Sequence, residues 1–130
     1  TINGMATTPN VLLIEDDPTL RQLYKEAFDH ADFEVLEADD GQYGVDLAIQ
    51  HQPAALILDL MLPRQGGLHV LRILRSMPET RTMPVIILTA LPNPEYREMA
   101  KDMVQGYFLK TQVKPKELVD AVRALIDESA

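Results

Sequence analysis

The sequence contains no cysteine, so disulfide bonds and thiol chemistry are excluded, as suits a protein of the reducing cytoplasm. It has no apolar run near the roughly 18 residues that a transmembrane helix needs. No basic stretch followed by an apolar segment marks a secretory signal at its start. A cytoplasmic protein without a membrane segment is therefore expected.

Positive charge is also scarce: 12 Lys and Arg stand against 20 Asp and Glu, for a net charge of −8. The negative electrostatic field of such a domain repels the phosphate backbone of nucleic acids, so we expect no direct nucleic-acid binding by this domain. No Gly-rich phosphate loop follows the first apolar run, which disfavours nucleotide binding. His30, His51 and His69 are scattered without metal-ligand spacing, and we expect ordinary surface or packing roles for them.

The length of 130 residues, with 46% apolar and 25% charged residues, predicts one globular domain. Residues 1–4 precede Met5 and look like an added remnant. We therefore expect residues 1–10 to be that remnant plus a lead-in, and the domain to span residues 11–130.

Short apolar runs occupy residues 11–14, 54–58, 85–88 and 107–109, and a more mixed run occupies residues 33–36. Unbroken apolar runs are typical of strands that are buried on both faces, as in parallel sheets. The mixed run is typical of an edge strand.

Between these runs the apolar residues repeat at helical spacing, and all of these stripes are expected to lie in the core. The stripes consist of Leu20, Leu23, Tyr24, Ala27 and Phe28; Val45, Ala48 and Ile49; Val70, Leu71, Leu74 and Met77; Tyr96, Met99, Ala100, Met103 and Val104; and Leu118, Ala121, Val122, Leu125 and Ile126. Asp17-Pro18 and Asn93-Pro94 each predict a capping side chain before a proline at the first helical position, and Pro115 opens the last helix. One helix is thereby predicted from about residue 93 to 104.

The resulting order, strand then helix five times, predicts an α/β fold with a doubly wound, five-stranded parallel sheet. Ligands of such sheets bind beyond the carboxyl ends of the strands. Here those ends carry Glu15 and Asp16, Asp59, Thr89 and Lys110.

Together these groups suit phosphoryl chemistry. Crowded carboxylates favour a cation among them, and oxygen ligands suit Mg²⁺. A carboxylate can attack phosphorus to form an aspartyl phosphate, while an ammonium and a hydroxyl stabilise the transferring oxygens. Alone, each group has a simpler explanation: Asp17 caps a helix, a threonine lies in a turn, a lysine is solvated. Capping alone does not explain their joint occurrence at four strand ends.

Four motifs closely resemble the response-regulator receiver family, from Val11 to the last helix. They are Val11-Leu12-Leu13-Ile14-Glu15-Asp16-Asp17; Leu58-Asp59-Leu60-Met61-Leu62-Pro63 with Gly66-Gly67; Ile87-Leu88-Thr89-Ala90; and Tyr107-Phe108-Leu109-Lys110. The resemblance implies a flavodoxin-like (βα)5 fold with strand order 2-1-3-4-5, and a receiver domain over residues 11–130.

The resemblance also implies the metal site. Asp59 matches the phosphoacceptor, and Glu15 and Asp16 match the acidic pair that holds Mg²⁺, with Asp16 the more direct ligand. The backbone carbonyl of Met61 matches the third protein ligand. Glu15 departs from the more usual aspartate, which leaves the assignment intact.

The remaining matches concern switching. Thr89 matches the switch hydroxyl, Tyr107 the switch aromatic residue and Lys110 the phosphate-binding lysine. The family usually places a proline, often after a cis bond, behind this lysine, whereas Thr111 stands here. A cis bond before a non-proline residue costs about 3–4 kcal/mol, so a trans bond is expected.

The implied function is a phosphoacceptor switch of a two-component phosphorelay, which catalyses only its own phosphotransfer and dephosphorylation. Its implied partners are a histidine kinase or a histidine phosphotransfer protein and a downstream effector that the sequence does not identify; the last helices could form a homodimer. Two alternatives stay open. One is a degenerate receiver that only binds proteins. The other is an aspartyl-phosphate phosphatase, although Met61 stands where such enzymes commonly carry a second acid.

Overall fold

The computed structural model describes residues 8–129, in which five strands and five helices alternate. The strands are β1 (Asn10–Ile14), β2 (Glu34–Ala38), β3 (Ala55–Leu58), β4 (Val85–Thr89) and β5 (Gly106–Leu109). The helices are α1 (Pro18–His30), α2 (Gly41–His51), α3 (Gly67–Ser76), α4 (Pro94–Ala100) and α5 (Pro115–Ser129). Each predicted apolar run thus forms a strand, and a helix follows each strand.

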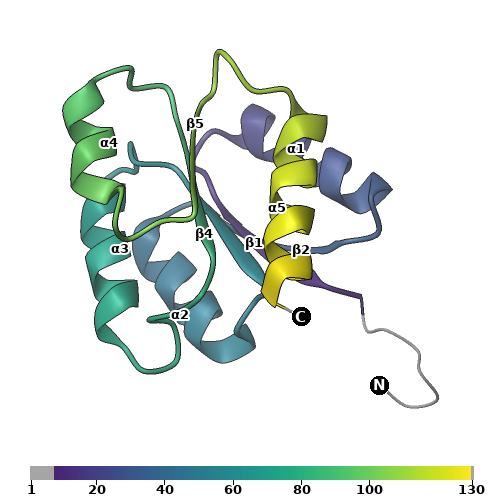
Figure 1. The fold of residues 1–130 in the computed structure, drawn as a ribbon, viewed down its shortest axis with the longest axis horizontal. Helices are drawn as coiled ribbons and strands as arrows, with labels where there is room; N and C mark the ends of the chain where they lie inside the picture. Colours follow the sequence, from purple (N-terminus) through teal and green to yellow (C-terminus); the bar gives the residue numbers. More distant parts are fainter. Residues whose placement is uncertain (1–7, 130) are drawn as a thin grey trace.

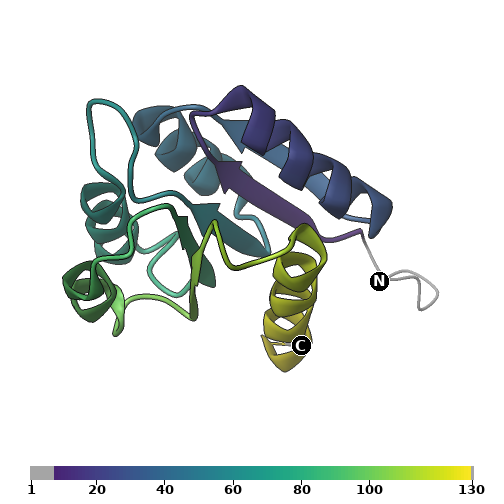
Figure 2. The ribbon, with the colours of Figure 1, turned by 90° about the horizontal axis from the view of Figure 1, so that it is seen from above.

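All neighbouring strands pair in parallel, in the order β2-β1-β3-β4-β5. This confirms the doubly wound sheet and its strand order. The edge position predicted for the second strand is also confirmed, because β2 stands at one end of the strand order of the described sheet. In Figure 1, α1 and α5 lie on one side of the sheet, and α2, α3 and α4 on the other; Figure 2 shows the same arrangement from above.

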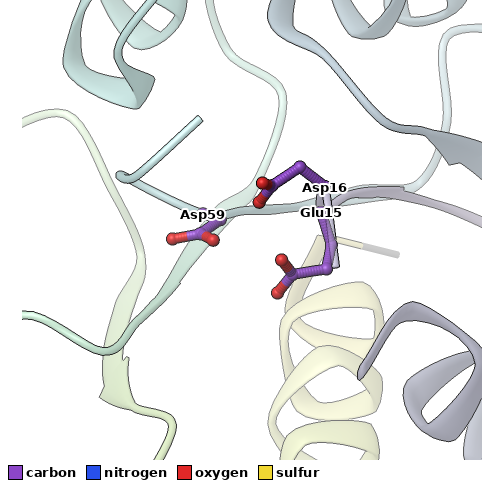
Figure 3. Close-up of side chains that lie close together, drawn as sticks. All are labelled: Glu15, Asp16 and Asp59. Atoms are coloured by element: carbon purple, nitrogen blue, oxygen red, sulfur yellow. The ribbon is translucent and has the colours of Figure 1, made fainter. Parts of the chain in front are cut away.

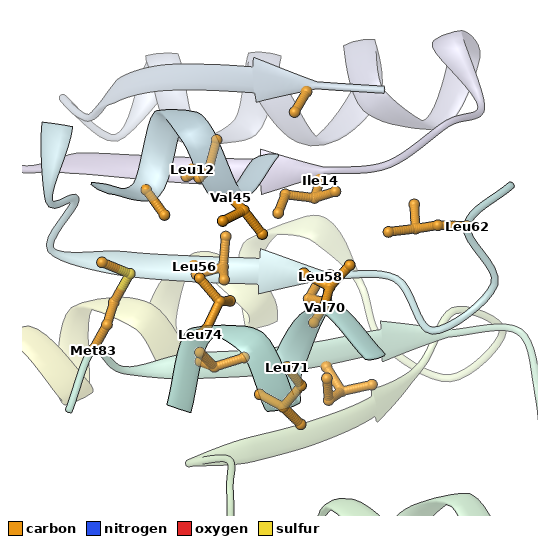
Figure 4. Packing of buried hydrophobic residues seen from close by; sticks show 14 of the residues in the cluster. Leu12, Ile14, Val45, Leu56, Leu58, Leu62, Val70, Leu71, Leu74 and Met83 are labelled. Carbon is orange, nitrogen blue, oxygen red and sulfur yellow. The ribbon is translucent and has the colours of Figure 1, made fainter. Parts of the chain in front are cut away.

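Alternate residues of the central strands enter two separate apolar clusters. Leu12 and Ile14 of β1 pack with residues of α2 and α3, whereas Val11 and Leu13 pack with residues of α1 and α5. The first cluster is drawn in Figure 4. Because both faces of β1, β3 and β4 are covered, these strands need apolar side chains on both faces, which explains their unbroken apolar runs.

The predicted helix starts are mostly confirmed. Asp17 caps α1, since its Oδ1 accepts hydrogen bonds from the Thr19 and Leu20 amides at 2.9 and 3.2 Å. Asn93 precedes α4 as expected, but its side chain makes no capping hydrogen bond, so that part of the prediction is wrong.

The helix predicted to reach residue 104 ends at Ala100. Beyond it the Met103 amide donates to the Ala100 carbonyl at 2.8 Å, and the Met103 carbonyl accepts from Arg75 Nε at 2.9 Å. A side chain of α3 therefore holds the carbonyl of this turn, a contact that helical spacing does not reveal.

Two stripe residues expected in the core are exposed instead: Leu23 of α1 and Met99 of α4, each 48% exposed. α1 is anchored on the sheet by Tyr24 and Phe28, which are 3% and 1% exposed. The apolar stripe of this helix is therefore wider than the face that it buries.

No helix among residues 8–129 is long and apolar enough to cross a bilayer. The predicted remnant and most of the lead-in, residues 1–7, lie outside the described residues.

Candidate functional site

The predicted site residues meet beyond the carboxyl ends of β1 and β3. Glu15 and Asp16 follow β1 directly, and Asp59 follows β3. Each contributes a carboxylate oxygen to a group whose members all lie within 4.8 Å of one another. Figure 3 shows the three side chains close together. Glu15 and Asp59 are buried, at 1% and 3% exposed, whereas Asp16 is exposed.

Lys110, which follows β5, reaches into this acidic group. Its Nζ lies 2.6 Å from Glu15 Oε1 and 2.9 Å from Asp59 Oδ2. The three side chains are only 13%, 2% and 4% exposed, so these ion pairs are largely shielded from water.

The electrostatics of the group follow from burial and pairing. Burial raises the pKa of Glu15, and this outweighs the opposing effect of its hydrogen bonds to Lys110 and to the Asp17 amide. Burial by itself would lower the pKa of Lys110, but the carboxylates of Glu15 and Asp59 together raise it above its ordinary value. Lys110 is therefore firmly charged at neutral pH.

Contacts of the side chain and of the backbone hold Asp59 in place. Its Oδ1 accepts a hydrogen bond from the Met61 amide at 3.0 Å, and its own amide donates to the Ile14 carbonyl at 3.1 Å. Gly67 passes so close that a Cβ there would collide with the Asp59 carbonyl oxygen and Leu60 Cα. A side chain at position 67 would thus displace the end of β3, which explains the glycine.

The two predicted switch residues lie on adjacent strands. Thr89 at the end of β4 is fully buried, and its hydroxyl accepts a hydrogen bond from the Leu91 amide at 3.2 Å. Tyr107 of β5 pairs in register with Ile87, and the guanidinium of Arg97 lies 5.5 Å from its ring centre. Among residues 8–129 the buried Tyr107 hydroxyl has no hydrogen-bond partner, and burial raises the pKa of Tyr107.

The peptide bond between Lys110 and Thr111 is trans, as expected because Thr111 is not a proline. The Lys110 amide donates to the Thr89 carbonyl at 2.8 Å, which ties the ends of β4 and β5 together. The lysine is thus placed by strand pairing.

The donor set fits a hard cation. Among the described residues its side-chain oxygens all come from carboxylates, two of them buried beside the Lys110 ammonium, and Mg²⁺ prefers oxygen donors of this kind. The histidines contribute nothing here: within residues 8–129, no group that could hold a metal contains one.

One residue at this edge escaped the sequence analysis. Arg21 of α1 donates from Nη1 to the Glu15 carbonyl at 2.7 Å and pairs through Nε with Glu37 Oε1 of β2 at 3.3 Å. Its position in the first turns of the helix after the acidic motif indicated little by itself. The Glu15 carbonyl and the Glu37 carboxylate become neighbours only when β1 pairs with β2.

The sequence profile of the response regulator receiver domain matches residues 11–123. The chain therefore belongs to the response regulator receiver family, which serves two-component signalling. The predicted resemblance is confirmed.

Three similar proteins illustrate the relationship. The DNA-binding dual master transcriptional regulator RpaA of Synechocystis is 36% identical over 118 residues, which is 91% of this chain and 49% of the relative. The receiver domain of Francisella response regulator 1452 is 29% identical, with a TM-score of 0.86 over 95% of this chain and all of that one. The receiver domain of the Pseudomonas aeruginosa sensor histidine kinase PA1611, solved with magnesium in its active-site cleft, is 25% identical, with a TM-score of 0.84 over 93% of this chain and 99% of that one. The chain thus spans about half the length of the curated relative.

Proposed function

We propose that this chain is a phosphoacceptor switch of a two-component phosphorelay and that Asp59 is its phosphorylation site. The observation that carries the proposal is the Lys110 ammonium between the buried carboxylates of Asp59 and Glu15, with Asp16 beside them. A buried carboxylate flanked by a cation and a metal-type oxygen cluster is what an aspartyl-phosphate site requires.

In the proposed reaction, an Asp59 oxygen attacks the phosphorus of a phosphohistidine donor, and the phosphorus–nitrogen bond breaks as the imidazole leaves. Lys110 exchanges one of its carboxylate partners for a phosphoryl oxygen, and the Thr89 hydroxyl can donate to another. Neither group needs a new position in the sheet, because strand pairing already places both at this edge.

We assign the metal ligands to the carboxylates of Asp16, Asp59 and Glu15 and to the backbone carbonyl of Met61. Mg²⁺ held there would supply positive charge to the transferring phosphoryl group. The fit of the carboxylate cluster to a hard cation supports this assignment, as does the magnesium in the related PA1611 receiver.

The proposed switch begins at Thr89. When its hydroxyl turns toward the phosphoryl group it leaves the Leu91 amide, and space opens for Tyr107 to turn further inward. The face formed by α4, β5 and α5 then changes for a downstream effector or for a second copy of the chain, which could dimerise through these last helices.

The donor in this proposal is a histidine kinase or a histidine phosphotransfer protein, acting in the cytoplasm. The chain catalyses only its own phosphotransfer and dephosphorylation. A receiver that has lost its chemistry is disfavoured by the complete set of Asp16, Asp59, Thr89 and Lys110. A phosphatase is disfavoured because the apolar Met61, 54% exposed, occupies the place of a general acid.

The test is phosphorylation by acetyl phosphate and Mg²⁺, followed by the mass of the intact protein. The wild type should gain one phosphoryl group, and Asp59→Asn none. Asp39→Asn is a matched control, because Asp39 is an exposed aspartate beyond the end of β2, and it should behave as the wild type. Equal mass gain in the wild type and in Asp59→Asn would refute the assignment.

Removing the proposed metal ligand gives a second arm. Asp16→Ala should lose Mg²⁺ binding and most phosphorylation, yet keep its fold, because the Asp16 side chain is exposed. Unchanged Mg²⁺ binding in this variant would show that Asp16 is not a ligand.

A further inference from the structure

The exposed Asp16 carboxylate owes its position to the backbone. Within residues 8–129 it accepts no hydrogen bond and forms no ion pair, although it lies within 4.8 Å of the Glu15 and Asp59 oxygens. A carboxylate among like charges tends to turn away from them. The orientation of the two peptide groups that flank Asp16 therefore determines where its side chain can point.

Both of these peptide groups are fixed by hydrogen bonds. The carbonyl before Asp16, that of Glu15, accepts from Arg21 Nη1 at 2.7 Å. The amide after it, that of Asp17, donates to Glu15 Oε2 at 3.1 Å. The backbone amide of Arg21 also donates to the Asp17 carbonyl at 2.9 Å, so α1 holds this turn through Arg21 twice.

Arg21 is itself held in place. Its Nε pairs with Glu37 Oε1 at 3.3 Å, and its side chain is only 21% exposed. The guanidinium thus joins α1, the end of β1 and the edge strand β2 through a fixed fork, which a lysine ammonium cannot reproduce.

We propose that Arg21 is a positioning residue: by holding the Glu15 carbonyl, it fixes the peptide before Asp16 and aims the Asp16 carboxylate at the space that it shares with Asp59. The inference rests on the proposed function in one respect, that this space binds Mg²⁺.

Charge and positioning make opposite predictions for the loss of Arg21. Arg21 is a cation near a cluster that binds a cation, so electrostatics alone predicts that its removal tightens Mg²⁺ binding. If Arg21 positions Asp16, its removal should weaken Mg²⁺ binding. The expected loss is about tenfold, which is typical when a residue that orients a metal ligand is removed. The sign of the change separates the two explanations.

The experiment is a titration of the purified chain with Mg²⁺ alone, followed through the backbone amide signals of residues 16 and 17 by NMR. Arg21→Met keeps the apolar length of the side chain and should bind Mg²⁺ about tenfold more weakly than the wild type. Arg21→Lys retains a hydrogen-bond donor and the charge, so its affinity for Mg²⁺ should lie between those of the wild type and Arg21→Met.

The matched control is Arg64→Met. Arg64 is another arginine beyond the carboxyl end of β3; its side chain is 75% exposed and pairs with Asp40 at the start of α2, not with the acidic turn. The control should bind Mg²⁺ as well as the wild type or slightly better, because it removes a positive charge and an exposed ion pair but no contact with the acidic turn.

A second readout needs no metal. In Arg21→Met the Asp17 amide should exchange its hydrogen faster than in the wild type, because the turn that holds it is loosened. A variant that is less stable but binds Mg²⁺ as tightly as the wild type would show a merely structural role and overturn the inference. Wild-type protein that binds no Mg²⁺ would overturn both the inference and the proposed metal site, whereas unaltered binding in Arg21→Met alone would leave the proposed function standing.

Discussion

Replacing Lys110 by methionine tests the electrostatic design of the site without any phosphodonor. The substitution keeps the length and the apolar stem of the side chain but removes the only cation that pairs with Glu15 and Asp59 among the described residues. Removing one partner of a buried ion pair costs about 3–5 kcal/mol. Because the site opens to solvent at Asp16, we expect the lower end, about 3 kcal/mol, or roughly 10 °C in the melting midpoint.

The dependence on pH should carry the same signature. In the wild type the pKa of Lys110 is raised, so its stabilising contribution is complete below the ordinary lysine pKa and is lost only as the pH rises through the raised value. Burial already raises the pKa of Glu15, and Lys110 opposes this rise. In Lys110→Met that opposing effect is gone, so the pKa of Glu15 should rise further. The deficit should therefore be largest from neutral pH up to the ordinary lysine pKa. It should shrink at lower pH as Glu15 is protonated, and at higher pH as Lys110 loses its proton in the wild type.

The assay is urea denaturation in the presence of a chelator, repeated with Mg²⁺. The ion should stabilise Lys110→Met more than the wild type, because it replaces the missing charge and no longer competes with the ammonium. Lys101→Met is the control: its pair with Glu98 is exposed, and the loss should stay within about 0.5 kcal/mol. A Lys110→Met protein as stable as the wild type, or a deficit independent of pH, would refute the argument.

Three further changes probe separate features. Met61→Asn should shorten the lifetime of the aspartyl phosphate, because residues 61 and 91 offer no polar group to orient a water; equal dephosphorylation rates would disprove this. Arg64 has φ 65°, so Arg64→Gly should relieve about 1 kcal/mol of backbone strain. Arg64→Ala loses the pair with Asp40 as Arg64→Gly does but keeps the strain, so it should be the less stable of the two. Equal free energies of unfolding would contradict this. Tyr107→Phe removes a buried hydroxyl that has no hydrogen-bond partner in the part of the chain that the structure describes, so thermal denaturation should show no loss of stability; a loss above about 1 kcal/mol would reveal a missing contact.

The sequence was most informative where local pattern and burial coincide. Because β1, β3 and β4 are covered on both faces, their unbroken apolar runs predicted the bounds of these strands to within one or two residues. The ends of these strands then placed the acidic residues at one edge by topology alone. Asp17 was identifiable as a cap because its hydrogen bonds reach only two and three residues along the chain.

What depends on contacts between distant elements could not be predicted. The turn after α4 is held by Arg75, which lies 28 residues before Met103 in the sequence. Leu23 and Met99 fit the helical spacing but lie beside the buried faces. Arg21 was missed because its partner Glu37 lies on another strand, and a surface arginine on a helix is by itself unremarkable.

The central claim is that phosphate bound to this chain is carried on the Asp59 carboxylate as an acyl phosphate. Its most direct test is to treat the protein with acetyl phosphate and Mg²⁺, reduce it with borohydride and sequence the peptides by mass spectrometry. Reduction turns an aspartyl phosphate into homoserine. We expect homoserine at position 59 alone and none in protein that was never phosphorylated. Homoserine at another aspartate, or phosphate retained on a hydroxyl with Asp59 unchanged, would contradict the account.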